Sequence, residues 1–419
     1  DLHSFPTRRS SDLRTSMGLI SAEFKKILSR KSVWIALLLL TLIEVGFVWQ
    51  LDRNYGNFPQ SDRFMRPAYR ALYREIGEGE ITPDKSDFVI SEFNRLAKIA
   101  LAGSYSIVYD PAMYTGYERA DYYLFKEGFY NPMRWAFAYK RKNDPIVERA
   151  AENIAFFEAI GDVYQSRRNR LIAGAYGGRE LTAFYDTAGF RELLLDRSCA
   201  LLMMLFVVFS LAPLFSIETT TGMALILKTV ERGRAATVRS KLLLAVGWIL
   251  ATEIVFSLVR LGATALFFGL HGAAYPLYGV VDLSYFRADF ALSFFSGTIG
   301  EAVGIKTLLE LLWLLFVGGI VLLVSRRVGK PFLSFLISFA LGVGIYALGD
   351  LSVPTPFAFA RWLIPTTLLD FSALFSRFDV ANVFGFPVYS VVLLVSLTFL
   401  LTGVFFFFTA VSRSGMEGG

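Results

Sequence analysis

Long apolar runs dominate this chain and limit what it can fold into. Several of them approach or exceed 18 residues with few or no charged side chains, which is typical of helices that cross a membrane. Hydrophobic residues make up 54% of the 419 residues, and the mean hydropathy is +0.48. We therefore predict an all-α polytopic membrane protein with about six transmembrane helices, at residues 32–51, 198–217, 242–270, 307–324, 331–348 and 388–410.

Lysine and arginine residues cluster in alternate connections between these runs. They gather before the first run, in the connection 218–241 and in the turn 325–330. Because short cytoplasmic connections carry an excess of Lys and Arg, we predict that these connections and both termini, including the tail 411–419, face the cytoplasm. The net charge of +6 is accounted for in this way, so we expect no nucleic-acid partner.

The remaining connections are then expected outside the cytoplasmic membrane. Residues 271–306 form an aromatic outer loop. Residues 349–387 form a second outer loop, in which the prolines and the semi-polar stretch 368–384 predict a re-entrant or interfacial hairpin.

Residues 52–197 are the longest outside segment. Acids and bases are nearly balanced there, and no apolar run is long enough to cross a membrane. A capping residue followed by proline marks a helix start, and the segment has three such pairs: Thr82-Pro83, Asn131-Pro132 and Asp144-Pro145. Gly177-Gly178 is predicted to end the last of these helices. We predict a large helical extracytoplasmic domain whose aromatic stripes build its core.

The N-terminal region divides into two parts. Residues 1–16 begin with a stretch that resembles the translated read-through of a sequencing adapter, so we expect an artefact or a disordered tail. Residues 17–31 combine an apolar face at helical spacing with basic side chains off that face, which predicts an amphipathic helix in the lipid interface. A plain charged flank that sets orientation is the alternative. The apolar face consists of Ile20, Phe24, Ile27 and Leu28.

Four ionisable residues fall inside predicted spans: Glu44, Glu253, Arg260 and Glu310. Such groups are costly in a bilayer and face protein or a wet pathway. Glu253 and Arg260 are seven residues apart and so share one face of a helix. One interpretation is that the four groups form a polar lining or an interface lock that rearranges during transport. The alternative is that they form structural ion pairs within one subunit or reach toward the membrane surface near a span end. For Glu310, near a span end, we favour the structural role.

The motifs of several catalytic classes are absent from the sequence. There is no Walker A phosphate-binding run, no G-x-S-x-G nucleophile elbow and no H-E-x-x-H zinc motif. A single cysteine and two distant histidines provide neither a disulfide nor a metal centre. We therefore predict a chain without catalytic residues or a metal site of its own.

The connection 218–241 contains an ordered set of polar residues. An acidic residue and a glycine precede an aliphatic run, threonine and two arginines follow, and Lys-Leu-Leu opens the next span. These residues are Glu218, Gly222, Lys228, Thr229, Arg232, Arg234 and Lys241. The order resembles the cytoplasmic loop of type-2 export permeases of the ATP-binding-cassette (ABC) family, with Val230 where that family often has proline.

The resemblance implies a non-catalytic transmembrane subunit of an efflux transporter in the cytoplasmic membrane of a bacterium. ATP and Mg²⁺ would be held by a separate cassette ATPase, and this chain would hold no cofactor. Residues Glu218–Arg234 would dock on the ATPase, and the chain would pair with a second copy or with a sister permease. The alternative for the arginines is contact with lipid phosphates under the positive-inside rule.

Two other classes of function remain open from the sequence. One is a membrane-anchored sensor or assembly protein that acts through residues 52–197. The other is a secondary transporter driven by ions through the buried carboxyl groups, a class that often shows internal repeats of its spans. No such repeat is visible in this sequence.

Overall fold

The computed structural model describes residues 20–54, 78–102, 118–222, 233–280, 290–348 and 362–411, together with residues 72, 76, 111, 113 and 114. Within these residues, six helical segments are long and apolar enough to cross a membrane. The six long apolar helices expected from the sequence are thereby confirmed. They are α2 (Lys31–Asn54), α9 (Ser198–Leu211) with α10 (Pro213–Thr220), α12 (Gly233–Phe267), α13 (Ile299–Arg327), α14 (Pro331–Leu348) and α16 (Ser390–Val411).

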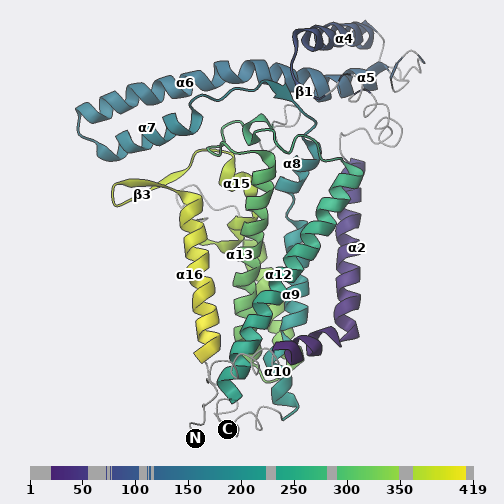
Figure 1. The fold of residues 1–419 in the computed structure, drawn as a ribbon, viewed down its shortest axis with the longest axis vertical. Coiled ribbons are helices and arrows are strands. Elements are labelled where there is room, and N and C mark those ends of the chain that lie inside the picture. The colour runs from purple at the N-terminus through teal and green to yellow at the C-terminus, as the bar shows by residue number, and fades with distance from the viewer. Residues whose placement is uncertain are drawn as a thin grey trace, which may run out of the picture.

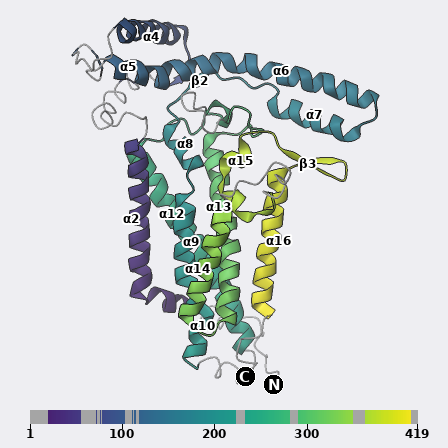
Figure 2. The ribbon, with the colours of Figure 1, turned by 180° about the vertical axis from the view of Figure 1, so that it is seen from behind.

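The six segments form one bundle with α13 at its centre (Figure 1). Helix α13 packs against α9, α12, α14 and α16, and α2 packs against α9 and α12 on the far side. The view from behind shows α14 beside α9 (Figure 2). Trp313, Val317 and Val321 of α13 are buried, as expected for a helix that is apolar on several faces.

The outer helices of the bundle expose large apolar side chains. Trp34 and Leu38 on α2, Phe332 on α14, and Phe399 and Phe407 on α16 are all exposed. Soluble proteins rarely expose apolar patches of this extent. A hydrocarbon environment around the bundle removes the cost of that exposure.

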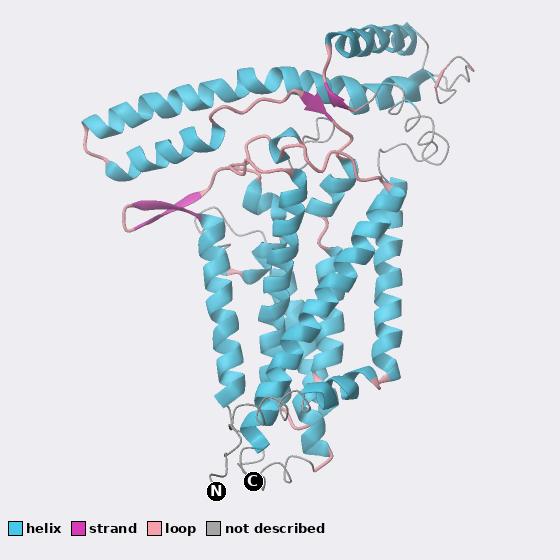
Figure 3. Cartoon of the chain, viewed as in Figure 1, coloured by secondary structure: helices cyan, strands magenta, loops and turns pink. Residues whose placement is uncertain are grey.

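A helical unit lies beyond one end of the bundle (Figure 3). It comprises α4 (Pro83–Ala102), α5 (Glu118–Phe125), the π-helix η1 (Lys126–Tyr130), α6 (Asn131–Ala159), α7 (Val163–Tyr176), α8 (Ala188–Leu195) and a ribbon of β1 (Gly79–Glu80) with β2 (Ala183–Phe184). Val89, Leu96, Phe129 and Phe184 contribute to a hydrophobic core of its own, whereas Phe190 and Leu194 of α8 pack into the core of the bundle. Helices α6 and α7 form an antiparallel arm that extends sideways over the bundle.

One of the three predicted helix starts in this unit is confirmed, and two are wrong. Helix α4 begins at Pro83. The chain is already helical through η1 where α6 follows at Asn131, without a side-chain cap, and Pro145 lies inside α6. Packing on α7 supports α6 through the proline, and the Asn143 amide donates a hydrogen bond to Tyr176 O at 2.7 Å. The predicted final helix is in fact two, because the chain turns at Gly161 (φ +76°) and Asp162 caps α7.

Other boundaries differ from the sequence-based ones at helix ends. Helix α13 begins at Ile299 rather than at 307, because Thr298 and Glu301 form a reciprocal capping box with N···O distances of 3.2 and 2.7 Å. The second predicted span is interrupted at Ala212, since Pro213 begins a new helix. The cytoplasmic connection predicted at 218–241 is shorter, because α12 already begins at Gly233.

The described parts of the two predicted outer loops contain short elements packed at the same end as the helical unit. The first has a 3₁₀ turn, η2 (Leu277–Gly279). The second has η4 (Pro365–Leu369), α15 (Phe371–Phe375) and an antiparallel hairpin of β3 (Val380–Val383) and β4 (Phe386–Tyr389). Where the sequence suggested a re-entrant or interfacial hairpin, the chain forms two buried helical turns and then the β-hairpin.

At the opposite end of the bundle, residues 20–28 form a helix at a steep angle to α2 (Figure 1). Ile27 and Glu23 are buried, while Phe24 is exposed and lies edge-on to Trp248. The predicted N-terminal amphipathic helix is therefore present over 20–28, with an acidic residue on its buried side.

The contact between α8 and the end of α12 tolerates no side chain at Gly189. A Cβ atom there would lie 2.2 Å from Gly269 O, which is backbone and cannot rotate away. We expect Gly189→Ala to lower the free energy of unfolding by about 1–3 kcal/mol through overpacking. Thermal unfolding in detergent measures the effect.

Gly174→Ala is the matched control, because a Cβ at Gly174 in α7 meets nothing within 4 Å. This change should leave stability unchanged or raise it by up to about 1 kcal/mol through helix propensity. Equal unfolding temperatures for the Gly189→Ala variant and the unsubstituted protein would contradict the packing described for α8.

Candidate functional site

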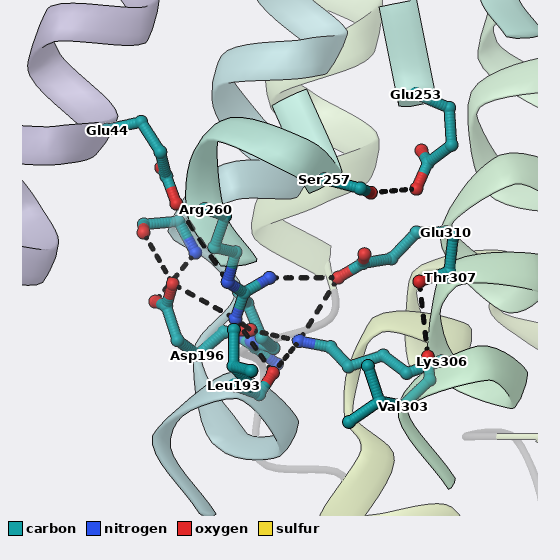
Figure 4. A network of polar contacts seen from close by, with 12 residues as sticks. Glu44, Leu193, Asp196, Glu253, Ser257, Arg260, Val303, Lys306, Thr307 and Glu310 are labelled. Carbon is teal, nitrogen blue, oxygen red and sulfur yellow. Dashed lines mark hydrogen bonds and ion pairs between the residues drawn. The ribbon is translucent and has the colours of Figure 1, made fainter. Parts of the chain in front are cut away.

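Two buried polar clusters lie at opposite ends of the bundle. The Arg260 cluster, near the helical unit, brings together α2, the end of α8, α12 and α13 (Figure 4). It consists of Glu44, Leu193, Asp196, Glu253, Ser257, Arg260, Lys306 and Glu310. The Lys241 cluster, at the other end, consists of Glu23, Leu214, Glu218 and Lys241.

Arg260 is the centre of the first cluster and is almost fully buried. Its Nη2 atom lies 3.2 Å from Asp196 Oδ2, its Nη1 atom 3.5 Å from Glu310 Oε1, and its Nε atom 3.9 Å from Glu44 Oε1. The guanidinium group thus faces a carboxylate on each of three separate segments. Arginine suits this role because its planar group presents several donors in fixed directions.

Arg260 also bonds the free backbone carbonyls at the end of α8. Its Nη2 atom donates to Leu193 O at 2.8 Å and to Asp196 O at 2.9 Å. Lys306 of α13 donates to the same two carbonyl oxygens and lies 3.1 Å from Glu310. The last carbonyls of a helix have no partner within the helix and carry partial negative charge, so two cations stabilise this end.

Asp196 lies between α8 and α9, where the chain passes from the helical unit into the bundle. Its carboxylate accepts hydrogen bonds from the Ser198 backbone N–H at 3.0 Å and the Ser198 hydroxyl at 2.9 Å. Burial alone would raise the pKa of Asp196, but the Arg260 guanidinium, these hydrogen bonds and Lys306 together hold the pKa below its ordinary value. Asp196 is therefore stabilised as an anion two residues before α9 begins.

Glu253 occupies a separate position in the cluster. It was predicted to share a helix face with Arg260, yet its carboxylate accepts a hydrogen bond from Ser257, one turn along α12, at 2.9 Å. Figure 4 shows it set back from the ion pairs around Arg260. Arg260 instead pairs with residues from other segments. The predicted shared face places Glu253 near the cluster but gives it no ion pair among the described residues.

In the Lys241 cluster, a fully buried lysine of α12 pairs with a glutamate of α10 across the start of the two helices' connection. Lys241 is 0% exposed, lies 2.7 Å from Glu218 Oε1 and 4.0 Å from Glu23 Oε2, and donates to Leu214 O. Its ammonium group also lies 4.9 Å from the centre of the Phe215 ring. The first and last residues of the predicted connection 218–241 therefore meet each other and the N-terminal helix.

Near the Lys241 cluster, side chains from other helices bond the backbone around Pro213, where the second span is interrupted. Proline has no N–H, so a break there leaves backbone groups without helical partners. Arg30 donates to Ser210 O at 2.9 Å, Ser334 donates to Ala212 O at 2.8 Å, and the Phe215 N–H donates to Ser325 Oγ at 3.0 Å. Side chains from several helices thus complete the backbone hydrogen bonding, as an apolar environment requires.

The structure covers only part of the predicted docking loop. Glu218 is ion-paired as described, and Gly222 has a φ of +72°, a conformation that favours glycine. Lys228, Thr229 and Arg232 lie outside the described residues, and for Arg234 only its place in the first turn of α12 is described. All four predicted intramembrane residues, in contrast, lie in or beside one cluster.

Sequence reasoning missed Asp196 and Lys306 and gave no role to Glu23. Lys306 and Glu310 are four residues apart, a spacing that places them together on a helix, but 306 was assigned to a loop. Asp196 was assigned to the outside domain. Among the described residues, no group of three or more His, Cys, Asp or Glu side chains is placed to hold a metal ion.

Comparison of the chain with protein-family models, with curated proteins and with solved structures gives no match.

We expect Arg260→Met to lower the free energy of unfolding by about 3–5 kcal/mol, because it leaves buried carboxylates without their cation. The measurement is unfolding in detergent, followed by circular dichroism. Arg170→Gln is the control, since Arg170 pairs with Glu158 on the surface and both side chains are largely exposed. Its loss should cost less than about 1 kcal/mol. Similar losses for the two variants would contradict the central role of Arg260.

Proposed function

We propose that this chain is the transmembrane permease subunit of an ABC exporter in a cytoplasmic membrane. In this proposal a separate ATPase binds the loop between α10 and α12 and supplies ATP-driven motion. The observation that carries the proposal is the buried pair of Lys241 with Glu218 at 2.7 Å. These two residues open and close the motif that resembles the cytoplasmic loop of type-2 export permeases.

The pair matters mechanically because it ties α10 to α12, the two helices that flank the loop. Lys241 is fully buried and also reaches Leu214 O and Glu23. A force on the loop would therefore act on α10, α12 and the N-terminal helix together. A loop with free ends would instead absorb such a force by changing its own shape.

Helix α12 would carry the motion across the bundle. It runs without interruption over 35 residues, and Arg260 lies about 28 Å beyond Lys241 at 1.5 Å per residue. Arg260 bonds the end of α8 and pairs with Glu44 and Glu310 on two other helices. A tilt of α12 driven from the loop would thus reach the point where the helical unit joins the spans.

The proposal also assigns each end of the bundle to one side of the membrane. The loop between α10 and α12, the N-terminus and the C-terminus would face the cytoplasm, and the helical unit would be an extracytoplasmic domain. The basic residues of the loop support this orientation. A second copy or a sister permease would complete the transporter.

The test is association with a cassette ATPase. The tagged chain, purified from membranes of its own host, should retain a protein that carries a Walker A motif and whose ATP hydrolysis depends on this chain. Arg232→Glu combined with Arg234→Glu should abolish that association and ATP-dependent transport, because the reversed charges oppose docking.

Arg168→Glu combined with Arg170→Glu on α7 is the matched control, since it reverses the same charges on the helical unit. It should leave association intact. If the Arg232/Arg234 variant keeps both association and transport, the assignment of the docking loop is wrong. If the unsubstituted chain retains no such ATPase, the proposed function itself is wrong.

A further inference from the structure

The hairpin of β3 and β4 carries an exposed aromatic tip. The turn residues are Phe384 and Gly385, with φ values of +51° and +83°. Phe384 is 98% exposed, and Phe386, the first residue of β4, is 56% exposed. Two-residue turns with positive φ at both positions strongly prefer Asn-Gly, so phenylalanine is unfavourable here in water for its backbone as well as for its ring.

The hairpin is held in place rather than loosely attached. Its strands pair over four residues each, and the Asn382 side chain accepts a hydrogen bond from the Gly385 N–H at 2.8 Å. From α7, Arg167 donates to Gly385 O at 3.1 Å and its guanidinium group lies 4.1 Å from the centre of the Phe386 ring. The tip is therefore fixed in position, with the Phe384 ring uncovered and the Phe386 ring partly covered by Arg167.

The following helix determines where the hairpin lies relative to a membrane. Strand β4 ends at Tyr389, and α16 begins at Ser390. The 22 residues of α16 measure about 33 Å, which matches a hydrocarbon core of about 30 Å. Ser390 thus marks one boundary of the hydrocarbon, and the hairpin lies at that boundary.

The direction of the hairpin places its tip over lipid. In both views it leaves the end of α16 sideways, away from the bundle (Figures 1 and 2). Four residues of β4 carry the tip about 14 Å to the side of α16. Helix α16 exposes Phe399, Leu400 and Phe407, so the lipid-facing side of the bundle adjoins the hairpin.

We propose that Phe384 and Phe386 insert into the interface between lipid headgroups and acyl chains at this end of the bundle. Aromatic and other apolar side chains favour that region. Arg167, directly behind Phe386, is placed to attract the phosphate groups of the lipids. The hairpin anchors the start of α16 at a fixed depth, and through Arg167 it ties the arm of α6 and α7 to the membrane surface.

The test places a probe on the tip of the full chain in phosphatidylcholine vesicles. Phe384→Cys is labelled with an environment-sensitive fluorophore, and Cys199, which is buried, contributes little labelling. Lipids with a nitroxide near the headgroup should remove most of the fluorescence, and lipids with a nitroxide deep in the acyl chain should remove less. Phe386→Cys is a second position in case the first variant does not fold.

Two further positions calibrate the measurement. Phe399→Cys on the exposed side of α16 should be quenched most by the deep nitroxide, and the exposed Asp84 on α4, changed to Cys, by neither. If Phe384 and Phe386 probes behave like the Asp84 probe, the proposal is wrong. It is also overturned if lipids do not quench them but oxidation cross-links two chains through these cysteines, because the tip then contacts a second copy.

Discussion

The apolar outer surface of the bundle is the constraint on which the rest of this structure depends. Large apolar side chains on α2, α14 and α16 face outward, as Leu38, Phe332 and Phe399 illustrate. Such a surface is stable in hydrocarbon and not in water. Hydrocarbon offers no hydrogen bonds, so every backbone or charged group inside the bundle needs a partner from the protein.

Both buried clusters provide such partners for backbone and charged groups, and they do so in the same way. Each lies near a point where a helix is interrupted, at the end of α8 or beside Pro213 in the second span, and in each a cation bonds backbone carbonyl oxygens. Arg260 and Lys306 bond Leu193 O and Asp196 O, and Lys241 bonds Leu214 O. Carboxylates from neighbouring helices then balance the charge. The clusters are thus supports for irregular backbone, and α12 connects them.

The sequence predicted the spans well because a run of about 20 apolar residues has few alternatives. It also identified Glu44, Glu253, Arg260 and Glu310, since charge within such a run is conspicuous. It did not predict Asp196 or Lys306, because each belongs to the cluster only through three-dimensional contacts with α12 and α13. Pro145 misled for a related reason: the packing of α6 on α7 outweighs a local signal for a helix start.

The position of the hairpin of β3 and β4 likewise depends on contacts that the sequence does not predict. A Phe-Gly turn is not a recognisable hairpin signal, and the re-entrant or interfacial hairpin predicted over 368–384 did not locate the turn. The structure adds the brace from Arg167 and the continuity with α16, which together define the position of the tip.

The central claim is that the bundle crosses a bilayer, with the helical unit and the loop between α10 and α12 on opposite sides. Labelling of Asp84→Cys and Lys228→Cys with a membrane-impermeant maleimide tests it directly in intact cells. The account predicts that the cysteine at 84 reacts from outside, and that the cysteine at 228 reacts only after the membrane is permeabilised. Reaction of both cysteines from the same side would contradict it.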